Sequence, residues 1–247
     1  MKVFQALALA ALTVGCSSNA SSTAAGTDGG AASSYAPVIV PANFVATIDN
    51  PFLPLKPGTV FRHRAVKASG NELIEVTVTR ETKVIMGVTC VVVHDLVTAE
   101  TADGGAGAIV EDTIDWYAQD KDGNVWYFGE NTKKYEGGQV STKGSWEGAV
   151  DGAKPGIAMK GAPKVGDVYR QEYYAGQAED QAQILSLTET ITGPTGSYQG
   201  CIRTKDFTEL EPEVVENKVF CRGVGHVFTE HVKGESEKQD LLSVTAP

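Results

Sequence analysis

The chain has 247 residues, of which 42% are hydrophobic, and it carries a formal net charge of −10. This length suits one domain or two small ones. An acidic chain with few basic clusters argues against nucleic acid as a partner, and against electrostatic adhesion of the folded body to anionic lipid.

The N-terminus has the layout of an export signal. Lys2 precedes a mostly apolar run, Val3–Val14, that is too short to cross a bilayer. The run ends in L-T-V-G-C, Leu12–Cys16, which resembles the lipobox of bacterial lipoproteins. This resemblance implies that a signal peptide, residues 1–15, is removed and that Cys16 carries a lipid anchor, which makes the bilayer a partner. The alternative is plain secretion with cleavage near Ala20.

A flexible tether is predicted over residues 16–35. After the cysteine this stretch contains Ser, Ala, Gly, Thr and Asn with one Asp, and no large apolar side chain before Tyr35. Such a segment cannot bury enough surface to offset the entropy lost on ordering. The sequence therefore predicts an exported protein on the cell membrane or outer membrane, facing the periplasm or the exterior.

The rest of the chain shows β-strand alternation and no sustained helical period. In Leu73–Glu81, apolar side chains alternate with Glu and Thr, which is typical of a strand with one wet face. The first half, residues 36–136, contains four further predicted strands: Thr59–Val66, Val88–Val97, Ile109–Ala118 and Val125–Glu130. Gly- and Asn-containing turn signals separate them. This pattern predicts an all-β fold, either an antiparallel sandwich or an open barrel.

An internal repeat suggests two similar halves. P-G-T-V-F-R at Pro57–Arg62 reappears as V-G-D-V-Y-R at Val165–Arg170, and weaker matches follow in the same order. The second half, residues 164–247, contains the predicted strands Asp167–Tyr174, Gln183–Thr192, Tyr198–Phe207, Val214–Cys221 and Gly225–Val232. We expect two tandem β-meander halves in one compact domain, joined by a Gly-rich connecting loop at residues 137–163.

Three cysteines follow Cys16. Thiols outside the cytoplasm tend to pair, and Cys201 and Cys221 lie on neighbouring predicted strands, so we expect a disulfide between them. Cys90 lies in the apolar run V-T-C-V-V-V and is expected to be a buried, inert thiol.

The most distinctive segment is the aromatic hairpin Asp115–Glu130. Asp122-Gly123 between aromatic strands predicts a two-residue turn. That register places Tyr117, Trp126 and Phe128 on one face of the hairpin, with Trp116 and Tyr127 on the other. One interpretation buries both faces, one in the core and one under the loop that carries Trp146. The other makes Tyr117, Trp126, Phe128 and Trp146 a stacking platform for a sugar or another flat ligand.

No metal, cofactor or catalytic site is predicted. Asp120, Asp122 and Asn124 have the spacing of a calcium loop, but the glycine and glutamate that an EF-hand needs are absent, which favours a turn. His226 and His231 are expected on opposite faces of a strand, which argues against a zinc-protease site.

The acidic side chains of the strands are expected on the surface. Glu111, Asp112 and Asp115 could join Glu130 as paired carboxylates on adjacent strands, but surface placement is favoured. The acidic run Glu209, Glu211 and Glu213 around a proline is expected to be a solvated loop, with weak calcium binding as the alternative.

The body resembles uncharacterised exported or lipid-anchored bacterial β-proteins. Three segments carry this resemblance: the aromatic hairpin, V-G-D-V-Y-R, and G-V-G-H-V at Gly223–Val227. It covers most of Asn50–Val232 and implies a fold and a location but no activity. We expect a non-catalytic protein that binds a small ligand or an envelope protein. The alternatives are a cell-envelope hydrolase with a site built from distant residues, or a structural or assembly accessory lipoprotein.

Overall fold

The computed structural model describes residues 35–247, and nearly all of its regular structure is β. The predicted signal peptide (1–15), the lipidation site Cys16 and the tether up to residue 34 lie outside the described residues. Within residues 35–247 there is no helix with the length and apolar character needed to cross a membrane.

Sixteen strands and one short 3-10 helix, η1 (Pro41–Asn43), make up the body. The first strands are β1 (Phe44–Val45), β2 (Val60–Lys67), β3 (Glu72–Ile85), β4 (Val88–Glu100), β5 (Ala106–Asp120) and β6 (Val125–Glu136). Five short strands follow: β7 (Gln139–Ser141), β8 (Trp146–Glu147), β9 (Lys154–Met159), β10 (Val168–Arg170) and β11 (Glu172–Tyr173). The last five are β12 (Gln181–Gly193), β13 (Gly196–Phe207), β14 (Val215–Cys221), β15 (Gly225–Lys233) and β16 (Glu237–Thr245).

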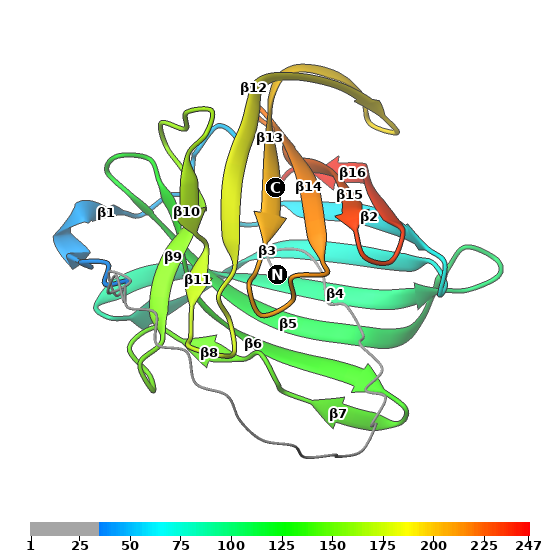
Figure 1. Ribbon diagram of the computed structural model, residues 1–247, viewed down its shortest axis with the longest axis horizontal. Coiled ribbons are helices and arrows are strands. Elements are labelled where there is room, and N and C mark those ends of the chain that lie inside the picture. The colour runs from blue at the N-terminus through cyan, green and yellow to red at the C-terminus, as the bar shows by residue number, and fades with distance from the viewer. Residues whose placement is uncertain (1–34) are drawn as a thin grey trace, which may run out of the picture.

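All the strands belong to one large antiparallel sheet. Its order is β10-β12-β13-β14-β15-β16-β2-β3-β4-β5-β6-β9-β11, with β1, β7 and β8 beside this path. The sheet curls, so that β12–β14 pass in front of β3 and β4 (Figure 1). Gln171 connects β10 to β11 along the chain, but among the described residues these two edge strands are not paired with each other by backbone hydrogen bonds. The sheet therefore does not close on itself.

The predicted strands correspond to β2–β6 and β10–β15, whereas other elements were not expected. Residues 137–163 are not a loop throughout, because they contain β7, β8 and β9. β16 was not predicted, and it joins the two runs of strands by pairing with β15 and β2. β2–β6 and β12–β16 are each a meander, but their equivalence as tandem halves stays a prediction.

Two apolar clusters lie on opposite faces of the sheet. The larger contains Tyr127 and Ile202, and we call the face that carries it the inner face. The smaller, on the outer face, contains Cys90, Trp116 and Phe128, with Phe44 from the N-terminal segment packed against it. Curling lets one sheet bury its inner face against itself, so no second layer is needed.

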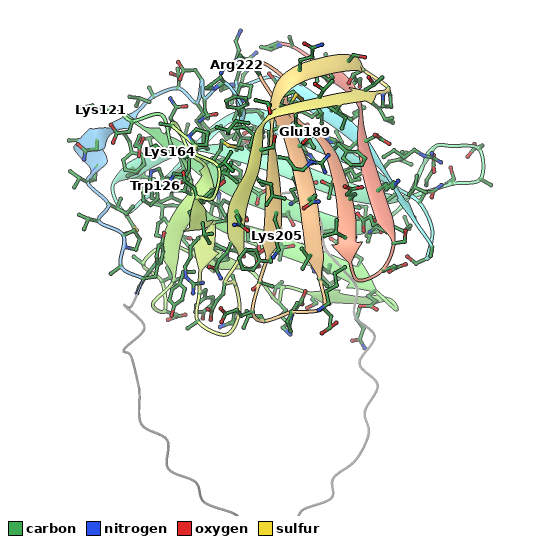
Figure 2. All side chains as sticks on the ribbon, turned by 45° about the horizontal axis from the view of Figure 1, so that its top comes forward. Lys121, Trp126, Lys164, Glu189, Lys205 and Arg222 are labelled. Atoms are coloured by element: carbon green, nitrogen blue, oxygen red, sulfur yellow. A yellow bond between two sulfur atoms is a disulfide. The ribbon has the colours of Figure 1, made fainter. Side chains whose placement is uncertain are left out.

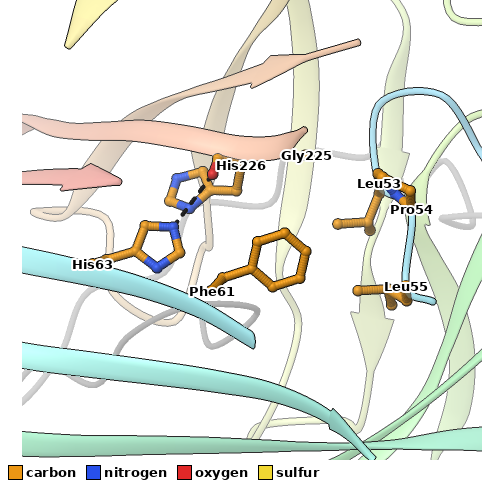
Figure 3. A pocket seen from close by; sticks show the side chains of 7 residues that line it. All are labelled: Leu53, Pro54, Leu55, Phe61, His63, Gly225 and His226. Atoms are coloured by element: carbon orange, nitrogen blue, oxygen red, sulfur yellow. Dashed lines mark hydrogen bonds between the residues drawn. The ribbon is translucent and has the colours of Figure 1, made fainter. Parts of the chain in front are cut away.

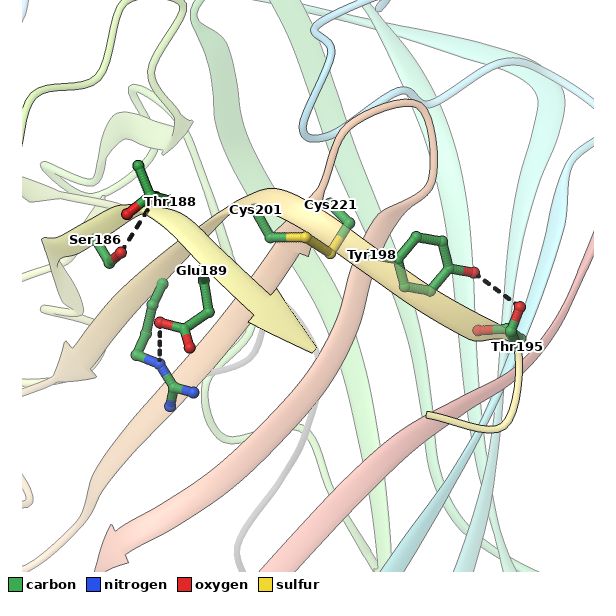
Figure 4. Close-up of a disulfide and its surroundings, with 8 residues drawn as sticks. Ser186, Thr188, Glu189, Thr195, Tyr198, Cys201 and Cys221 are labelled. Atoms are coloured by element: carbon green, nitrogen blue, oxygen red, sulfur yellow. Dashed lines mark hydrogen bonds and ion pairs between the residues drawn. A yellow bond between two sulfur atoms is a disulfide. The ribbon is translucent and has the colours of Figure 1, made fainter. Parts of the chain in front are cut away.

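A disulfide joins Cys201 on β13 to Cys221 on β14, with their Cα atoms 4.3 Å apart (Figure 4). Cys90 is a buried free thiol, and burial raises its pKa to about 12. A thiol with so high a pKa is a poor nucleophile at neutral pH.

The N-terminal segment closes one end of the curled sheet. The Asn50 side chain donates hydrogen bonds to the carbonyl oxygens of Gly123 (2.8 Å) and Lys160 (3.2 Å). Leu53 and Leu55, which follow, line an apolar cavity of about 10 Å³ with Phe61, His63 and His226 (Figure 3). A cavity of that size holds about one water molecule.

Candidate functional site

The aromatic hairpin turns over three residues, not two. Asp120 and Asn124 flank the turn, the Asp120 amide donates to the Asn124 carbonyl (3.0 Å), and Gly123 adopts φ 81°. A glycine at positive φ suits the three-residue loop. The Asp120 carboxylate accepts the amides of Asp122 (3.0 Å) and Asn124 (2.8 Å), so these oxygens organise a turn.

The longer turn changes which aromatic rings share a face. Tyr117 pairs with Tyr127, and a bulge then sets Trp116 opposite Gly129. Tyr117 and Tyr127 stack on the inner face with ring centroids 4.9 Å apart, and Trp146 meets Tyr127 edge-on at 5.4 Å. The expected faces were therefore wrong between the turn and the bulge, because the longer turn shifts the register by one residue; beyond the bulge, Asp115 lies opposite Glu130, as the two-residue turn also predicts.

The four predicted ligand-binding rings do not form one platform. Tyr117 and Trp146 are buried on the inner face, while Phe128 is buried and Trp126 half-buried on the outer face. The outer face is covered by Phe44, 5.6 Å from Phe128, and not by the Trp146 segment. Trp126, whose indole N–H donates to Asp120 (2.8 Å), remains partly accessible, and its role in ligand binding stays a prediction.

Three of the four carboxyl residues expected on the surface are buried. The buried ones are on the inner face of β5 and β6 and are 4% exposed or less: Glu111, Asp115 and Glu130. The fourth, Asp112, faces outward and pairs with His94 at 2.7 Å. Asp95 on β4 joins them on the inner face. We call Asp95, Glu111, Asp115 and Glu130 the acidic wall. The surface assignment failed because the polar face of these strands is the concave side of a curled sheet.

Burial and mutual repulsion favour the protonated form of Asp95 and Asp115 on the acidic wall. Desolvation, with the charges of Glu130 and Asp95, raises the pKa of Asp115 well above its usual value, even though the Tyr127 hydroxyl donates to it at 2.6 Å. Desolvation, with Glu111 and Glu130, likewise raises the pKa of Asp95 well above its usual value. The neutral acid is thus the favoured form of both side chains.

The opposite part of the inner face carries charged partners. Lys218 on β14 is 1% exposed and lies 3.2 Å from Glu216 and 3.7 Å from Asp206. The His231 Nε2 lies 3.0 Å from Glu216 and 3.6 Å from Glu237. We call Asp206, Glu216, Lys218, His231 and Glu237 the ion-paired wall.

Ion pairing reverses the protonation preference of Glu216 on this wall. Burial alone would raise the pKa of Glu216, but Lys218 and His231 hold it at about 2. Burial alone would lower the pKa of Lys218, but the charges of Glu216 and Asp206 raise it. For Asp206 burial prevails, and its pKa is raised to about 6 despite the attraction of Lys218.

The two walls belong to one electrostatic network. The positive charge of Lys218 opposes the rise in the pKa of Asp95 across the interior. Burial, together with the charges of Asp180 and Glu130, raises the pKa of Glu172 on β11. The Trp146 indole N–H donates to Glu172 at 2.8 Å. The described residues bury nine carboxyl side chains: Asp95, Glu111, Asp115, Glu130, Glu172, Asp180, Asp206, Glu216 and Glu237. We call this network the acid-lined interior.

Gln239 and Asp95 are among the residues of this interior that have buried polar atoms without a hydrogen-bond partner. Gln239 on β16 is fully buried, and neither atom of its amide has a partner among the described residues; the same holds for one carboxyl oxygen of Asp95. Gln239 pairs in register with Thr229, which pairs with Lys218, so the amide lies in the polar row of the ion-paired wall. Buried polar groups without partners are costly and call for an explanation.

The arrangement suits proton exchange better than a point metal site. Between residues 35 and 247, no three His, Cys, Asp or Glu side chains are grouped closely enough to hold a metal ion. The carboxyl groups are instead distributed along several strands. Neutral acids in such a row can release protons when positive charge enters beside them.

The histidines do not build a hydrolytic site. His63 and His226 face each other at 5.2 Å in the apolar cavity, and burial lowers the pKa of both, that of His63 to about 4. His226 and His231 share the inner face, contrary to expectation, because a bulge in β15 breaks the alternation. Sequence reasoning also missed Lys218 and Gln239; the alternation of Glu216, Lys218 and Phe220 on β14 was the available signal.

Comparisons with known proteins give two structural matches. The fold is similar to a protein described as exported, with a YmcC-like fold, from Bacteroides fragilis NCTC 9343: identity is 15%, the TM-score 0.45, and the match covers 79% of this chain and 99% of that chain. It is also similar to a protein described as a lipoprotein from Parabacteroides distasonis ATCC 8503, with 16% identity, a TM-score of 0.42 and the same coverage. No protein-family model and no curated protein matches the chain. The two descriptions agree with the predicted resemblance.

Proposed function

We propose that this protein is a lipid-anchored, extracytoplasmic binding protein that takes up an organic cation in its acid-lined interior. The observation that carries the proposal is the burial of nine carboxyl side chains around Lys218, with the unpartnered amide of Gln239 in the same network. The lipobox-like segment ending at Cys16 supports the anchor.

Stability alone is a poor reason for such an interior. Burying ionisable groups costs several kcal/mol each even when they are paired, and well-packed apolar residues of similar size often serve the fold better. The other end of the same sheet shows that alternative, because it is filled by Leu53, Leu55 and Phe61. The contrast supports a role for the acidic groups beyond packing.

The distribution of the carboxyl groups favours a ligand with several separated positive charges. A single metal ion needs three or more ligands around one point, whereas these groups run from Glu130 across to Glu237. A linear polyamine presents ammonium groups at intervals and can displace protons from Asp95 and Asp115 one after another. Such exchange makes uptake stronger at higher pH, where fewer protons compete.

The test is thermal unfolding of the full chain with spermine as the probe. Binding to the folded state stabilises it by about 2.7 kcal/mol at one hundred times Kd, so we expect Tm to rise with spermine concentration, and more at pH 8 than at pH 6. The doubly substituted variant Asp95→Asn/Asp115→Asn should lose this rise.

Two matched variants control for adhesion to the acidic surface. Asp112→Asn removes an outward carboxylate from the same strand as Asp115, and Glu209→Gln/Glu211→Gln/Glu213→Gln removes three exposed charges. Both should keep the spermine response of the parent chain. The proposal fails if spermine leaves Tm unchanged, or if the interior and surface variants lose the response equally.

A further inference from the structure

A patch of exposed apolar side chains lies where the chain enters the folded body. Val84 and Met86 come from the end of β3 and its turn, Val38 and Val40 from the N-terminal segment, and Val150 from the segment after β8. Val38 is 83% and Val84 64% exposed. We call these five residues the entry patch.

Contacts between their neighbours place these segments side by side. A Cβ on Gly87 would lie 3.0 Å from Pro41, and one on Gly148 would lie 3.3 Å from the sulfur of Met86. The Lys83 ammonium lies 2.6 Å from Glu147. The β3 turn is therefore packed between the N-terminal segment and the strand that precedes Val150.

The entry patch adjoins the point from which the predicted tether departs. The Tyr35 hydroxyl donates to the Pro155 carbonyl at 2.8 Å, which holds the start of the described chain against the body only three residues before Val38. Cys16 precedes Tyr35 by 19 residues, and a coil of that length spans on the order of 25 Å. A lipid anchor at Cys16 would thus hold this side of the body near the bilayer.

Amphipathic and basic side chains occur on the same side of the molecule. Half-buried Trp126 meets Phe44 edge-on at 6.2 Å, and the Lys121 amide donates to the Asn43 carbonyl at 2.8 Å. In the view of Figure 2, Trp126, Lys121 and Lys164 are labelled on the same side of the molecule. Tryptophan and lysine beside exposed apolar groups are typical of surfaces that meet a lipid headgroup layer.

We infer that the entry patch rests on the lipid surface to which the chain is anchored, which orients the body with the β3–β4 turn toward the bilayer. The inference relies on the lipid anchor of the proposed function and is independent of the cation site. Apolar side chains at such an interface sit about 5–10 Å into the boundary between headgroups and acyl chains.

The experiment places a fluorophore at Val84→Cys in the full chain, purified after the cell has exported and processed it, on phosphatidylethanolamine–phosphatidylglycerol vesicles containing brominated acyl chains. Cys90 is buried and Cys201 is disulfide-bonded, so the new thiol is the accessible one among the described residues. The control is Val232→Cys on β15, which is also exposed. We expect about twofold quenching at position 84 and almost none at position 232, because bromine quenches over the depth that an interfacial side chain reaches.

Each other outcome overturns a definite statement. If the protein floats with the vesicles but neither position is quenched, the inferred orientation is wrong, the anchor stands, and the patch is free for a protein partner. Equal quenching at both positions also contradicts a fixed orientation. If the protein does not float with vesicles at all, the lipid anchor itself is refuted.

Discussion

Both walls of the interior contain buried carboxyl groups, but Asp95 and Asp115 on one wall and Glu216 on the other have opposite pKa shifts. On the acidic wall, burial and the neighbouring carboxyl groups raise the pKa of Asp95 and Asp115. On the ion-paired wall, Lys218 and His231 keep the pKa of Glu216 low. Two cationic partners within ion-pair distance thus favour the ionised form of Glu216, whereas burial among carboxyl groups favours the neutral form of Asp95 and Asp115. This difference predicts opposite responses to mutation and to pH.

The largest effect is expected for Lys218→Met. Losing the ammonium leaves Asp206 buried without its cationic partner and Glu216 with His231 alone, and breaking a buried ion pair in this way costs about 3–5 kcal/mol. Urea unfolding at pH 7 measures the change in the free energy of unfolding. Asp115→Asn, which replaces a neutral acid by a group of the same shape, should cost far less. Equal losses in the two variants would erase the distinction between the walls.

Removing the disulfide should destabilise the strands that carry the ion-paired wall. Cys201 and Cys221 join β13 to β14 across a separation of 20 residues, and closing a loop of that length is worth about 3 kcal/mol. The variant Cys201→Ala/Cys221→Ala should therefore unfold at lower urea concentration, with Cys90→Ala as the control. An unchanged midpoint would show that β14 is held without the covalent link.

The pH dependence of stability should separate the walls. The folded-state pKa of Asp115 is raised, so its stabilising contribution is complete below the unfolded pKa near 4 and is lost as pH rises through the folded value, by about 1.4 kcal/mol per pH unit. Asp115→Asn should flatten this alkaline decline in Tm.

Glu216 has the opposite sign. Its folded pKa is about 2, so its contribution is present above the unfolded pKa and is lost as pH falls toward 2. Glu216→Gln should remove the decline on the acid side and leave the alkaline side alone. The assigned pKa shifts would be contradicted if Glu216→Gln changed Tm on the alkaline side and Asp115→Asn changed it on the acid side.

The smallest effect is expected for Asp112→Asn, on the outer face of β5. Its pair with His94 is partly exposed, with side-chain exposures of 36% and 29%, and such pairs contribute about 0–1 kcal/mol. Chemical denaturation should find this variant close to the parent chain. If Asp112→Asn lowered the free energy of unfolding as much as Lys218→Met, the cost of losing an ion pair would not depend on its burial.

The strands could be predicted because side-chain alternation is local. β3, with Ile74, Val76 and Val78 on one face, is recognisable from nine residues of sequence. Register was less accessible: the Gly123 turn shifts the pairing by one residue, which exchanges the faces next to the turn, and the bulge beside Trp116 shifts the pairing back. Short-range patterns do not determine such shifts, since a three-residue turn also satisfies the Asp-Gly signal.

The acid-lined interior could not be read from the strands one at a time. Glu111, Thr113 and Asp115 alternate like a solvent-facing row, and only the curl of the sheet encloses them. The partner that distinguishes the walls, Lys218, comes from β14, more than one hundred residues later. Sequence alone offers no measure of that curl, so the buried acids and their cation were found only in three dimensions.

The most direct measurement is a carbon-13 NMR titration of the side-chain carboxyl groups in the full chain, with Asp95, Asp115 and Glu216 assigned through their Asn and Gln variants. The account predicts that Glu216 titrates near pH 2, while Asp95 and Asp115 stay protonated well above pH 4. Titration of all three together near pH 4 would contradict it, because the two walls would then not differ.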